Sequence, residues 1–201
     1  AGETAADGYG HGTHVAGLIA ASLNNGSGIA GPAPIVQLKP YKVLGADGRG
    51  TVENIARAIQ EAAGAGADVI NMSLQAYFSE GPNPSTLKLA VQYAASRGVL
   101  MVAAAGNGRQ CTSCNPYDTV AYPAAYPEVM AVAALDHADR RPSYSNFGPE
   151  VEIAAPGGSS SRPMLSTWSP AAASLCSLPP DLYGDRYCTR YGTSQATGLV
   201  S

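Results

Sequence analysis

Hydrophobic residues alternate along the chain between short continuous runs and stripes with the 3.6-residue period of a helix. The continuous runs predict strands that are buried on both faces, as in a parallel sheet. They lie at 69–74, 99–105, 129–134 and 151–155. A looser alternation over 35–44 predicts one more strand.

Three segments have the composition and boundaries of helices. Residues 11–22 are small and apolar, and the sequence Leu-Asn-Asn-Gly at 23–26 ends them. Thr51 is placed to cap a helix whose apolar face is ended by Gly64 and Gly66, and Pro84-Ser85 opens another that stops at Gly98. The apolar faces of these two helices are Ile55, Ala58, Ile59 and Ala62, and Leu87, Ala90, Val91 and Ala94.

The order of these elements predicts an α/β fold of three layers, with a mostly parallel sheet and helices on both faces. With 201 residues and no internal repeat or linker, residues 1–201 are expected to belong to one domain. Residues 157–191 are rich in Ser, Pro and Gly, and we expect them to form a long loop stapled by cysteines.

Composition narrows the range of partners. Charged residues make up only 13% of the chain, and the formal net charge is -3 without a basic stripe, so a nucleic-acid partner is not expected. No apolar run approaches the length of a membrane span, so no membrane partner is expected either.

Four cysteines, at positions 111, 114, 176 and 188, leave two interpretations open. An even number favours disulfides, with three pairings that the sequence does not separate. A four-thiolate zinc site is the alternative, and the wide spacing of Cys176 and Cys188 argues against it.

Three short motifs carry candidate chemistry. His11 lies in Gly-His-Gly-Thr-His-Val-Ala-Gly, Asn107 in Ala-Gly-Asn-Gly, and Ser194 in Gly-Thr-Ser-Gln-Ala. A base, an amide donor and a nucleophile, each framed by small residues, are three of the four parts needed for serine-dependent acyl transfer.

Together the motifs resemble the subtilisin-like serine proteases, and the similarity extends over the chain apart from 157–191. The segments 42–48 and 69–74 also look like bacterial subtilisins. The resemblance implies that Ser194 is the nucleophile and His11 the general base. The Asn107 side chain and the Ser194 backbone N–H would hold the oxyanion.

The resemblance also implies a secreted, monomeric endopeptidase that acts on proteins or peptides and needs no cofactor for its chemistry. An extended substrate would pair with two chain edges, and its side chain before the cleaved bond would enter a pocket. The edge positions are Gly48, Arg49, Gly50, Ser73, Leu74 and Gln75, and the pocket positions are Ala104, Ala105, Gly106, Ala121, Tyr122, Pro123 and Ala124. Because bacterial relatives often carry glycine at positions 121 and 124, we expect a narrower pocket that favours medium apolar side chains.

The chain departs from the family pattern in three respects. Members carry the third catalytic residue in an Asp-Ser-Gly or Asp-Thr-Gly turn well upstream of the histidine, whereas Asp7-Gly8 has the sequence of a solvated turn. We therefore expect residues 1–201 to be an internal piece that lacks the N-terminal Asp motif and the C-terminal helices, with poor or no activity of its own. Gly198 stands where relatives commonly have proline.

Weaker signals concern metals and packing. The loop at 23–29 resembles one that holds calcium in bacterial subtilisins; its candidate ligands are the carbonyls of Leu23, Ser27 and Ile29 and the side chain of Asn25. A plain turn is the alternative to a structural Ca²⁺ site. His14, Trp168 and the tyrosines at 183, 187 and 191 are expected to serve in packing.

Two other functions fit the same motifs. A peptide ligase or macrocyclase would use an amine instead of water to accept the acyl group. A non-catalytic peptide-binding pseudoenzyme would be favoured if the upstream acid were absent from the gene.

Overall fold

The structure is a computed structural model that describes residues 6–77, 85–108, 119–176 and 186–201. Its centre is a parallel sheet in the order β1-β2-β3-β4. These strands are Val69–Met72, Leu100–Ala104, Met130–Leu135 and Val151–Pro156. Each lies within one of the four apolar runs or overlaps it and ends one residue later, which confirms the predicted sheet.

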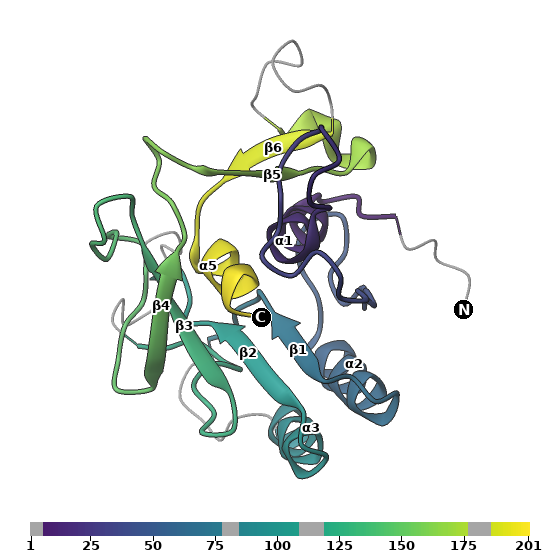
Figure 1. The fold of residues 1–201 in the computed structure, drawn as a ribbon. Helices are drawn as coiled ribbons and strands as arrows, with labels where there is room; N and C mark the ends of the chain where they lie inside the picture. Colours follow the sequence, from purple (N-terminus) through teal and green to yellow (C-terminus); the bar gives the residue numbers. More distant parts are fainter. Residues whose placement is uncertain (1–5, 78–84, 109–118, 177–185) are drawn as a thin grey trace.

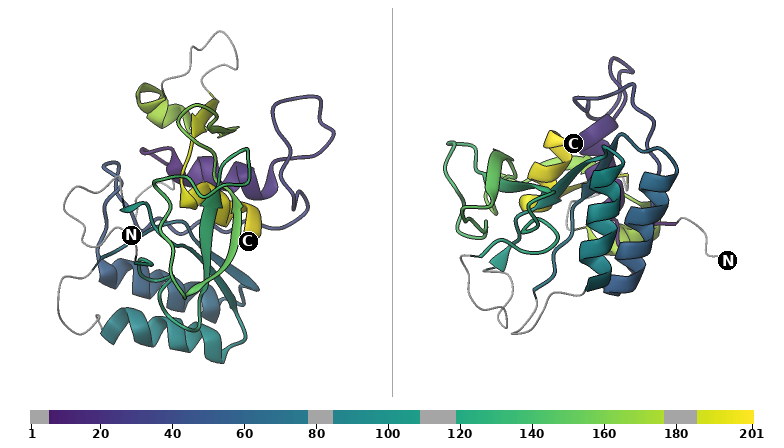
Figure 2. Two further views of the ribbon diagram at one scale, coloured as in Figure 1. Left: turned by 90° about the vertical axis from the view of Figure 1, so that its left-hand side faces the viewer. Right: turned by 90° about the horizontal axis from the view of Figure 1, so that it is seen from below.

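Helices cover both faces of this sheet, so the described part of the chain has three layers (Figures 1 and 2). α2 (Val52–Gly64) and α3 (Ser85–Ser96) pack together on one face. On the other face, α5 (Thr193–Val200) lies against the strands, and α1 (His11–Ala20) packs on α5. The predicted fold class is confirmed.

The core explains why the strand sequences are apolar without interruption. Successive side chains of a strand point to opposite faces. In β2, Met101 and Ala103 join the cluster beneath α2 and α3, whereas Val102 joins the cluster beneath α5. Both faces are buried, so alternation with polar residues would place polar groups in the core.

The helix boundaries follow the predicted signals. Thr51 Oγ1 accepts a hydrogen bond from the backbone N–H of Asn54 at 3.2 Å and so caps α2. Gly98 follows α3 with φ +77°, a left-handed conformation that glycine adopts without strain. α1 ends at Ala20, two residues before the predicted end.

The strand predicted over 35–44 is wrong, because the structure has an irregular segment there. A strand needs a neighbour for its backbone hydrogen bonds, and no described strand pairs with this segment. The alternating apolar residues are correspondingly exposed; Ile35 is 97% exposed and Val36 47%.

Residues 157–191 contain more structure than the predicted loop. β5 (Met164–Thr167) and β6 (Tyr187–Arg190) pair antiparallel, and a 3-10 helix, η2, spans Pro170–Leu175. The predicted staple is present as a disulfide between Cys176 and Cys188. That disulfide excludes the zinc site formed by all four thiolates; Cys111 and Cys114 lie outside the described residues.

α1 lies close to β5, and a glycine makes this possible. A Cβ added at Gly17 would come within 2.2 Å of Thr167 Oγ1 and 2.5 Å of Ser166 Oγ. Those two hydroxyls instead donate to α1 backbone carbonyls, Ser166 to His14 and Thr167 to Thr13. The helix that begins with His11 is therefore tied to the hairpin that leads into α5.

Candidate active site

The candidate residues gather where β1 and β2 end. Ser73 directly follows β1, and Asn107 lies three residues after the end of β2. The carboxyl ends of adjacent parallel strands form one edge of the sheet, which is where ligands bind in open α/β folds. α5 begins at the same edge, with Ser194 as its second residue.

Ser194 is fixed to the segment that follows β1. Its hydroxyl donates to the Ser73 carbonyl at 3.4 Å, and the Ser73 hydroxyl donates to the Ser194 carbonyl at 2.9 Å. The structure has no hydrogen bond between Ser194 and His11. The 3.4 Å contact is long for a hydroxyl donor, and rotation about a single side-chain bond redirects it.

Asn107 is oriented by the residue that precedes Ser194. Its Oδ1 accepts the backbone N–H of Thr193 at 2.9 Å and the Thr193 hydroxyl at 3.2 Å. Because the oxygen of the carboxamide is bound in this way, the Nδ2 donor is turned away from Thr193. α5 begins with Thr193, and the start of a helix leaves N–H groups without intrahelical partners.

Gln75 also contacts Asn107, through its side chain. Gln75 Oε1 accepts the backbone N–H of Asn107 at 2.7 Å and lies 3.5 Å from Asn107 Nδ2. The sequence placed Gln75 on a substrate edge but gave no reason to connect it to the oxyanion group.

Asn146 is a second residue that the sequence analysis missed. It is fully buried, and its Nδ2 contacts the Ala105 carbonyl at 3.2 Å while its Oδ1 accepts the Gly108 N–H at 2.7 Å. It therefore holds both ends of the turn that carries Asn107. A polar pair, Ser145-Asn146, between apolar strands is the signal that could have found it.

Asp7 is not the solvated turn residue that we expected. Its carboxylate accepts the backbone N–H groups of Tyr9, Gly10 and Thr13 and the Thr13 hydroxyl, at 2.7–3.2 Å. Burial alone would raise the pKa of Asp7, but these hydrogen bonds outweigh it and the pKa is lowered. The negative charge is held at the N-terminus of α1, where the helix dipole stabilises it.

His11 is the first residue of α1 and lies near that charge. Burial lowers the pKa of His11 below its ordinary value of 6.5; the Asp7 carboxylate raises it, and the Arg190 guanidinium lowers it. The net effect lowers the pKa of His11, and this favours the neutral imidazole that a general base requires. No carboxylate among the described residues hydrogen-bonds His11.

The first candidate substrate edge, Gly48-Arg49-Gly50, lies in a turn. Gly45 and Arg49 are joined by a backbone hydrogen bond of 2.8 Å, and Gly48 has φ +73°. The Tyr9 ring covers Gly48, where an added Cβ would come within 2.8 Å of it. Tyr9 also lies 6.5 Å from His11 between ring centroids, which places this edge beside the histidine.

The second edge meets the candidate pocket. Ala76, just after Ser73-Leu74-Gln75, pairs antiparallel with Tyr122 through two backbone hydrogen bonds of 2.9 and 3.0 Å. The Ala121 N–H donates to the Ala105 carbonyl at 2.8 Å, so the two predicted pocket walls, 104–106 and 121–124, are neighbours. Ala121 and Ala124 are buried, as residues that limit the depth of a pocket would be.

The loop at 23–29 curls tightly outside this region. Asn24, Gly26 and Gly28 have positive φ, and Asn25 Oδ1 accepts the Ser27 N–H at 3.0 Å. Asn25, Ser27 and Ile29 line a cavity of about 320 Å³ together with residues of α1 and Tyr187. The loop offers neutral oxygens of the kind that calcium binds, but no carboxylate.

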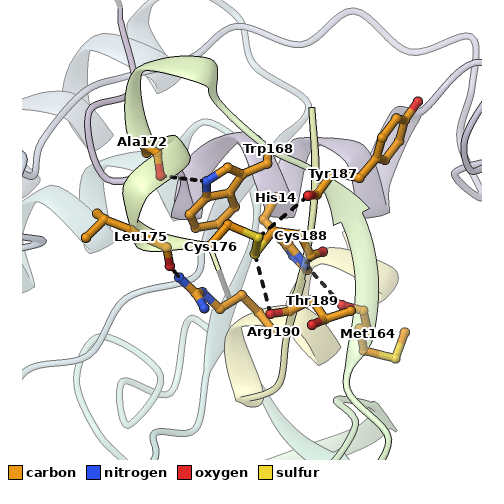
Figure 3. The surroundings of a disulfide bond; sticks show 10 residues. All are labelled: His14, Met164, Trp168, Ala172, Leu175, Cys176, Tyr187, Cys188, Thr189 and Arg190. Atoms are coloured by element: carbon orange, nitrogen blue, oxygen red, sulfur yellow. Dashed lines mark hydrogen bonds between the residues drawn. A yellow bond between two sulfur atoms is a disulfide. The ribbon is translucent and has the colours of Figure 1, made fainter. Parts of the chain in front are cut away.

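The residues expected to pack do so where they are described. His14 is completely buried, with Nε2 at 3.2 Å from the Met164 carbonyl and 3.1 Å from the Cys188 carbonyl. Trp168 is 3% exposed and lies beside the disulfide (Figure 3). Tyr187 covers Gly28, and Tyr191 contacts the Tyr144 ring. Tyr183 lies outside the described residues.

Within the part of the chain that the structure describes, none of the helices has the length and apolar character needed to cross a bilayer.

The fold and the site define the class of protein, a three-layer α/β fold with the serine and asparagine motifs at one sheet edge and the histidine at the start of α1, which packs on α5. The chain belongs to the subtilase family, whose model matches residues 1–201. It is 48% identical to Subtilisin BL of Lederbergia lenta over 97% of its own length and 61% of that protein. Its identity to the Thermostable alkaline protease of Halalkalibacterium halodurans is 43%, over 97% of this chain and 46% of that one.

Among solved structures, Sphericase is similar with a TM-score of 0.76 and 35% identity. The match covers 99% of this chain and 65% of that chain. The chain thus spans less than two thirds of the length of each of these three relatives.

Proposed function

We propose that the protein is a serine endopeptidase in which Ser194 attacks the peptide carbonyl and is acylated. His11 takes the Ser194 proton and delivers it to the leaving amine, and water then hydrolyses the acyl-enzyme. Asn107 Nδ2 and the Ser194 N–H stabilise the oxyanion.

The observation that carries this proposal is the binding of Asn107 by Thr193. Two hydrogen bonds from Thr193 fix the carboxamide oxygen, so the Nδ2 donor is oriented before any substrate arrives. Preorganised donors at the start of a helix are the feature that acyl transfer needs most, because negative charge develops there in the transition state.

We propose that a carboxylate other than those of the described residues orients the His11 imidazole. Asp7 does not serve this purpose, since its two oxygens are bound by Tyr9, Gly10 and Thr13. Loss of the orienting carboxylate in a serine protease lowers kcat by about 10⁴.

We further propose that 1–201 belongs to one peptidase domain of a secreted, monomeric enzyme that cleaves proteins or peptides. Catalysis needs no cofactor, since the nucleophile, base and oxyanion donors are all side-chain or backbone groups. Substrate pairs with residues 48–50 and 73–75, and its side chain before the cleaved bond enters the pocket between 104–106 and 121–124.

Incubating the complete protein with a defined peptide, and analysing the products by mass spectrometry, tests this function. We expect hydrolysed ends that carry one added water, and none with Ser194→Ala. Joined ends in place of hydrolysed ones would support the ligase. Binding of the peptide without any bond change would support the pseudoenzyme.

We also propose that the loop at 23–29 binds calcium. Its backbone curl and the Asn25 carboxamide present oxygens, but a complete shell of six to eight requires further ligands. Calcium should raise the unfolding temperature of the complete protein over that in a chelator, and Asn25→Ala should reduce the difference. An equal unfolding temperature with and without calcium would refute the site.

A further inference from the structure

Arg190 occupies a defined position near the candidate catalytic groups. It is the last residue of β6 and lies four residues before Ser194. Its guanidinium carbon is 4.6 Å from the centre of the Trp168 ring, and its Nη2 donates to the Leu175 carbonyl (Figure 3). A long cationic side chain is thus held in one place by an aromatic face and a backbone acceptor.

Trp168 connects this cation to the start of α1. Its Nε1 donates to the Ala172 carbonyl at 2.8 Å, which fixes the ring. The same ring lies against Gly10, where an added Cβ would come within 2.3 Å of it. Gly10 immediately precedes His11, so the Trp168 indole contacts both the Arg190 guanidinium and the residue next to His11.

The disulfide stabilises this arrangement from two sides. Cys176 directly follows Leu175, which accepts the Arg190 hydrogen bond, and Cys188 lies two residues before Arg190 on β6. The bond between the two sulfur atoms therefore keeps the acceptor and the donor together (Figure 3).

Among the described residues, the Leu175 carbonyl alone accepts a hydrogen bond from the Arg190 side chain. Neither of the ion pairs in the described part of the chain includes Arg190. A guanidinium has five N–H donors in a planar fork that matches a carboxylate, and the contact with Leu175 uses only Nη2. The half-buried cation is therefore suited to bind a carboxylate that approaches from outside.

We propose that Arg190 is a specificity-determining residue that selects substrates with an acidic side chain in the segment following the cleaved bond. The inference rests on the proposed peptidase function. The edges 48–50 and 73–75 hold the segment before the bond, whereas His11 donates its proton to the amine of the segment that leaves. Arg190 is connected to the start of α1 through the Trp168 ring, and it lies on β6, which forms no part of those edges.

The electrostatics of the histidine are consistent with this location. Burial and Arg190 lower the pKa of His11, Asp7 raises it, and His11 and Arg190 both act on His14. These effects agree with the path from Arg190 through the Trp168 ring to the start of α1.

Cleavage of matched peptides by the complete protein tests the proposal. The peptides are identical up to the cleaved bond and carry Glu or Gln at the first or second position after it. For the parent protein we expect kcat/KM to be about three- to tenfold higher with Glu at one of these positions, and the preference to shrink as salt is added. Arg190→Gln should abolish the preference, Arg190→Glu should reverse it, and Arg190→Lys should retain part of it.

Different results would refute the peptidase function and the selection by Arg190. If no peptide is cleaved, the peptidase function fails. If both peptides are cleaved equally by the parent protein, or if Arg190→Gln keeps the Glu preference, the selection by Arg190 is refuted. Should Arg190→Gln not fold, the salt dependence of the parent and the preference of Arg190→Lys decide the question.

Reduction of the disulfide provides a second readout. Without the bond between Cys176 and Cys188, Leu175 no longer holds Arg190 in place, so the Glu preference should fall in reductant and return on reoxidation. A preference that is unaffected, in protein shown by mass spectrometry to be reduced, contradicts the role assigned to this clamp.

Discussion

At the scale of single residues, Thr193 has two functions that its sequence position does not reveal. It orients Asn107 through its N–H and hydroxyl, and its hydroxyl also accepts the Gly106 N–H at 3.3 Å. The residue beside the nucleophile thus fixes the turn that carries the oxyanion donor. The oxyanion donor Asn107 and the nucleophile Ser194 are therefore held in position by the same residue, Thr193.

Thr193→Val removes the hydroxyl and keeps the shape of the side chain. We expect kcat to fall by about tenfold with little change in KM, because the Thr193 N–H still holds Asn107. Asn107→Ala should cost more; in a subtilisin, itself a member of this family, loss of such a donor lowers kcat by about 10²–10³.

The matched control for Thr193→Val is Thr197→Val. Thr197 is equally buried in α5 and donates its hydroxyl to the Thr193 carbonyl at 2.7 Å, but it does not contact Asn107. Steady-state kinetics should show the loss only at position 193. An equal loss in both variants would mean that the helix, rather than the oxyanion donor, had been disturbed.

The size of the candidate pocket depends on the methyl groups of single alanine residues. Ala121→Gly should enlarge the candidate pocket, and the rate on a Trp peptide relative to a Leu peptide should rise by about tenfold. Ala125→Gly, in the same segment but outside the predicted walls, is the control. A parent protein that cleaves the Trp peptide as well as the Leu peptide would contradict the narrow pocket.

At the scale of elements, α1 is positioned by its contact with β5. Gly17→Ala forces a methyl group against the hydroxyls of Ser166 and Thr167, and we expect the free energy of unfolding to fall by about 1–3 kcal/mol. Because α1 begins with His11, activity should fall as well.

Gly12→Ala is the control on the same helix. A Cβ at Gly12 would lie 3.6 Å from Asp7 Oδ2, an ordinary contact, and the position is exposed. Alanine should therefore be neutral or stabilising there by up to about 1 kcal/mol. Urea unfolding of both variants checks the pair, and equal destabilisation would refute the tight contact at Gly17.

His14 joins α1 to β5 and β6 and makes their packing depend on pH. Burial lowers the pKa of His14 from 6.5 to about 4, against the hydrogen bonds to Met164 and Cys188, which raise it. Between these values the unfolded chain binds more protons than the folded one, so stability rises with pH. The free energy of unfolding is therefore about 3 kcal/mol higher above pH 6.5 than near pH 4, as far as His14 is concerned. This stability is lost as the pH falls from 6.5 towards 4.

Unfolding free energies between pH 4 and 7 test this dependence. His14→Gln should be less stable than the parent near pH 7, and the difference should shrink as the pH falls. A difference that stays constant over the range would show that His14 does not titrate with folding.

At the scale of the whole molecule, the sequence predicted two kinds of feature correctly. These are helix boundaries, which depend on neighbouring residues, and strands that are buried on both faces. The run at 99–105 predicted β2 because both faces of this strand are covered, and Thr51 predicted the start of α2 because a cap acts within one turn. The segment 35–44 has the alternation of a strand but no described partner, and alternation alone does not supply hydrogen bonds.

In the candidate site, too, some features could be predicted from the sequence and others depend on the fold. The motifs predicted His11, Asn107 and Ser194 as site residues, because the small residues that flank them can be recognised in the sequence. The contacts that orient them were not predictable: Asn146 reaches the Asn107 turn from 38 positions further along the chain, and Gln75 from 32 positions before it. Such contacts arise only when the parallel strands bring their ends together.

The central claim is that Ser194, His11 and Asn107 act as one catalytic unit. Labelling of the complete protein with a fluorophosphonate, read by peptide mass spectrometry, tests it most directly, because the reagent needs an activated serine and an oxyanion site. We predict modification of Ser194 alone, absent in Ser194→Ala and strongly slowed in His11→Ala and Asn107→Ala. Unlabelled Ser194, or labelling at the same rate without His11, would contradict the account.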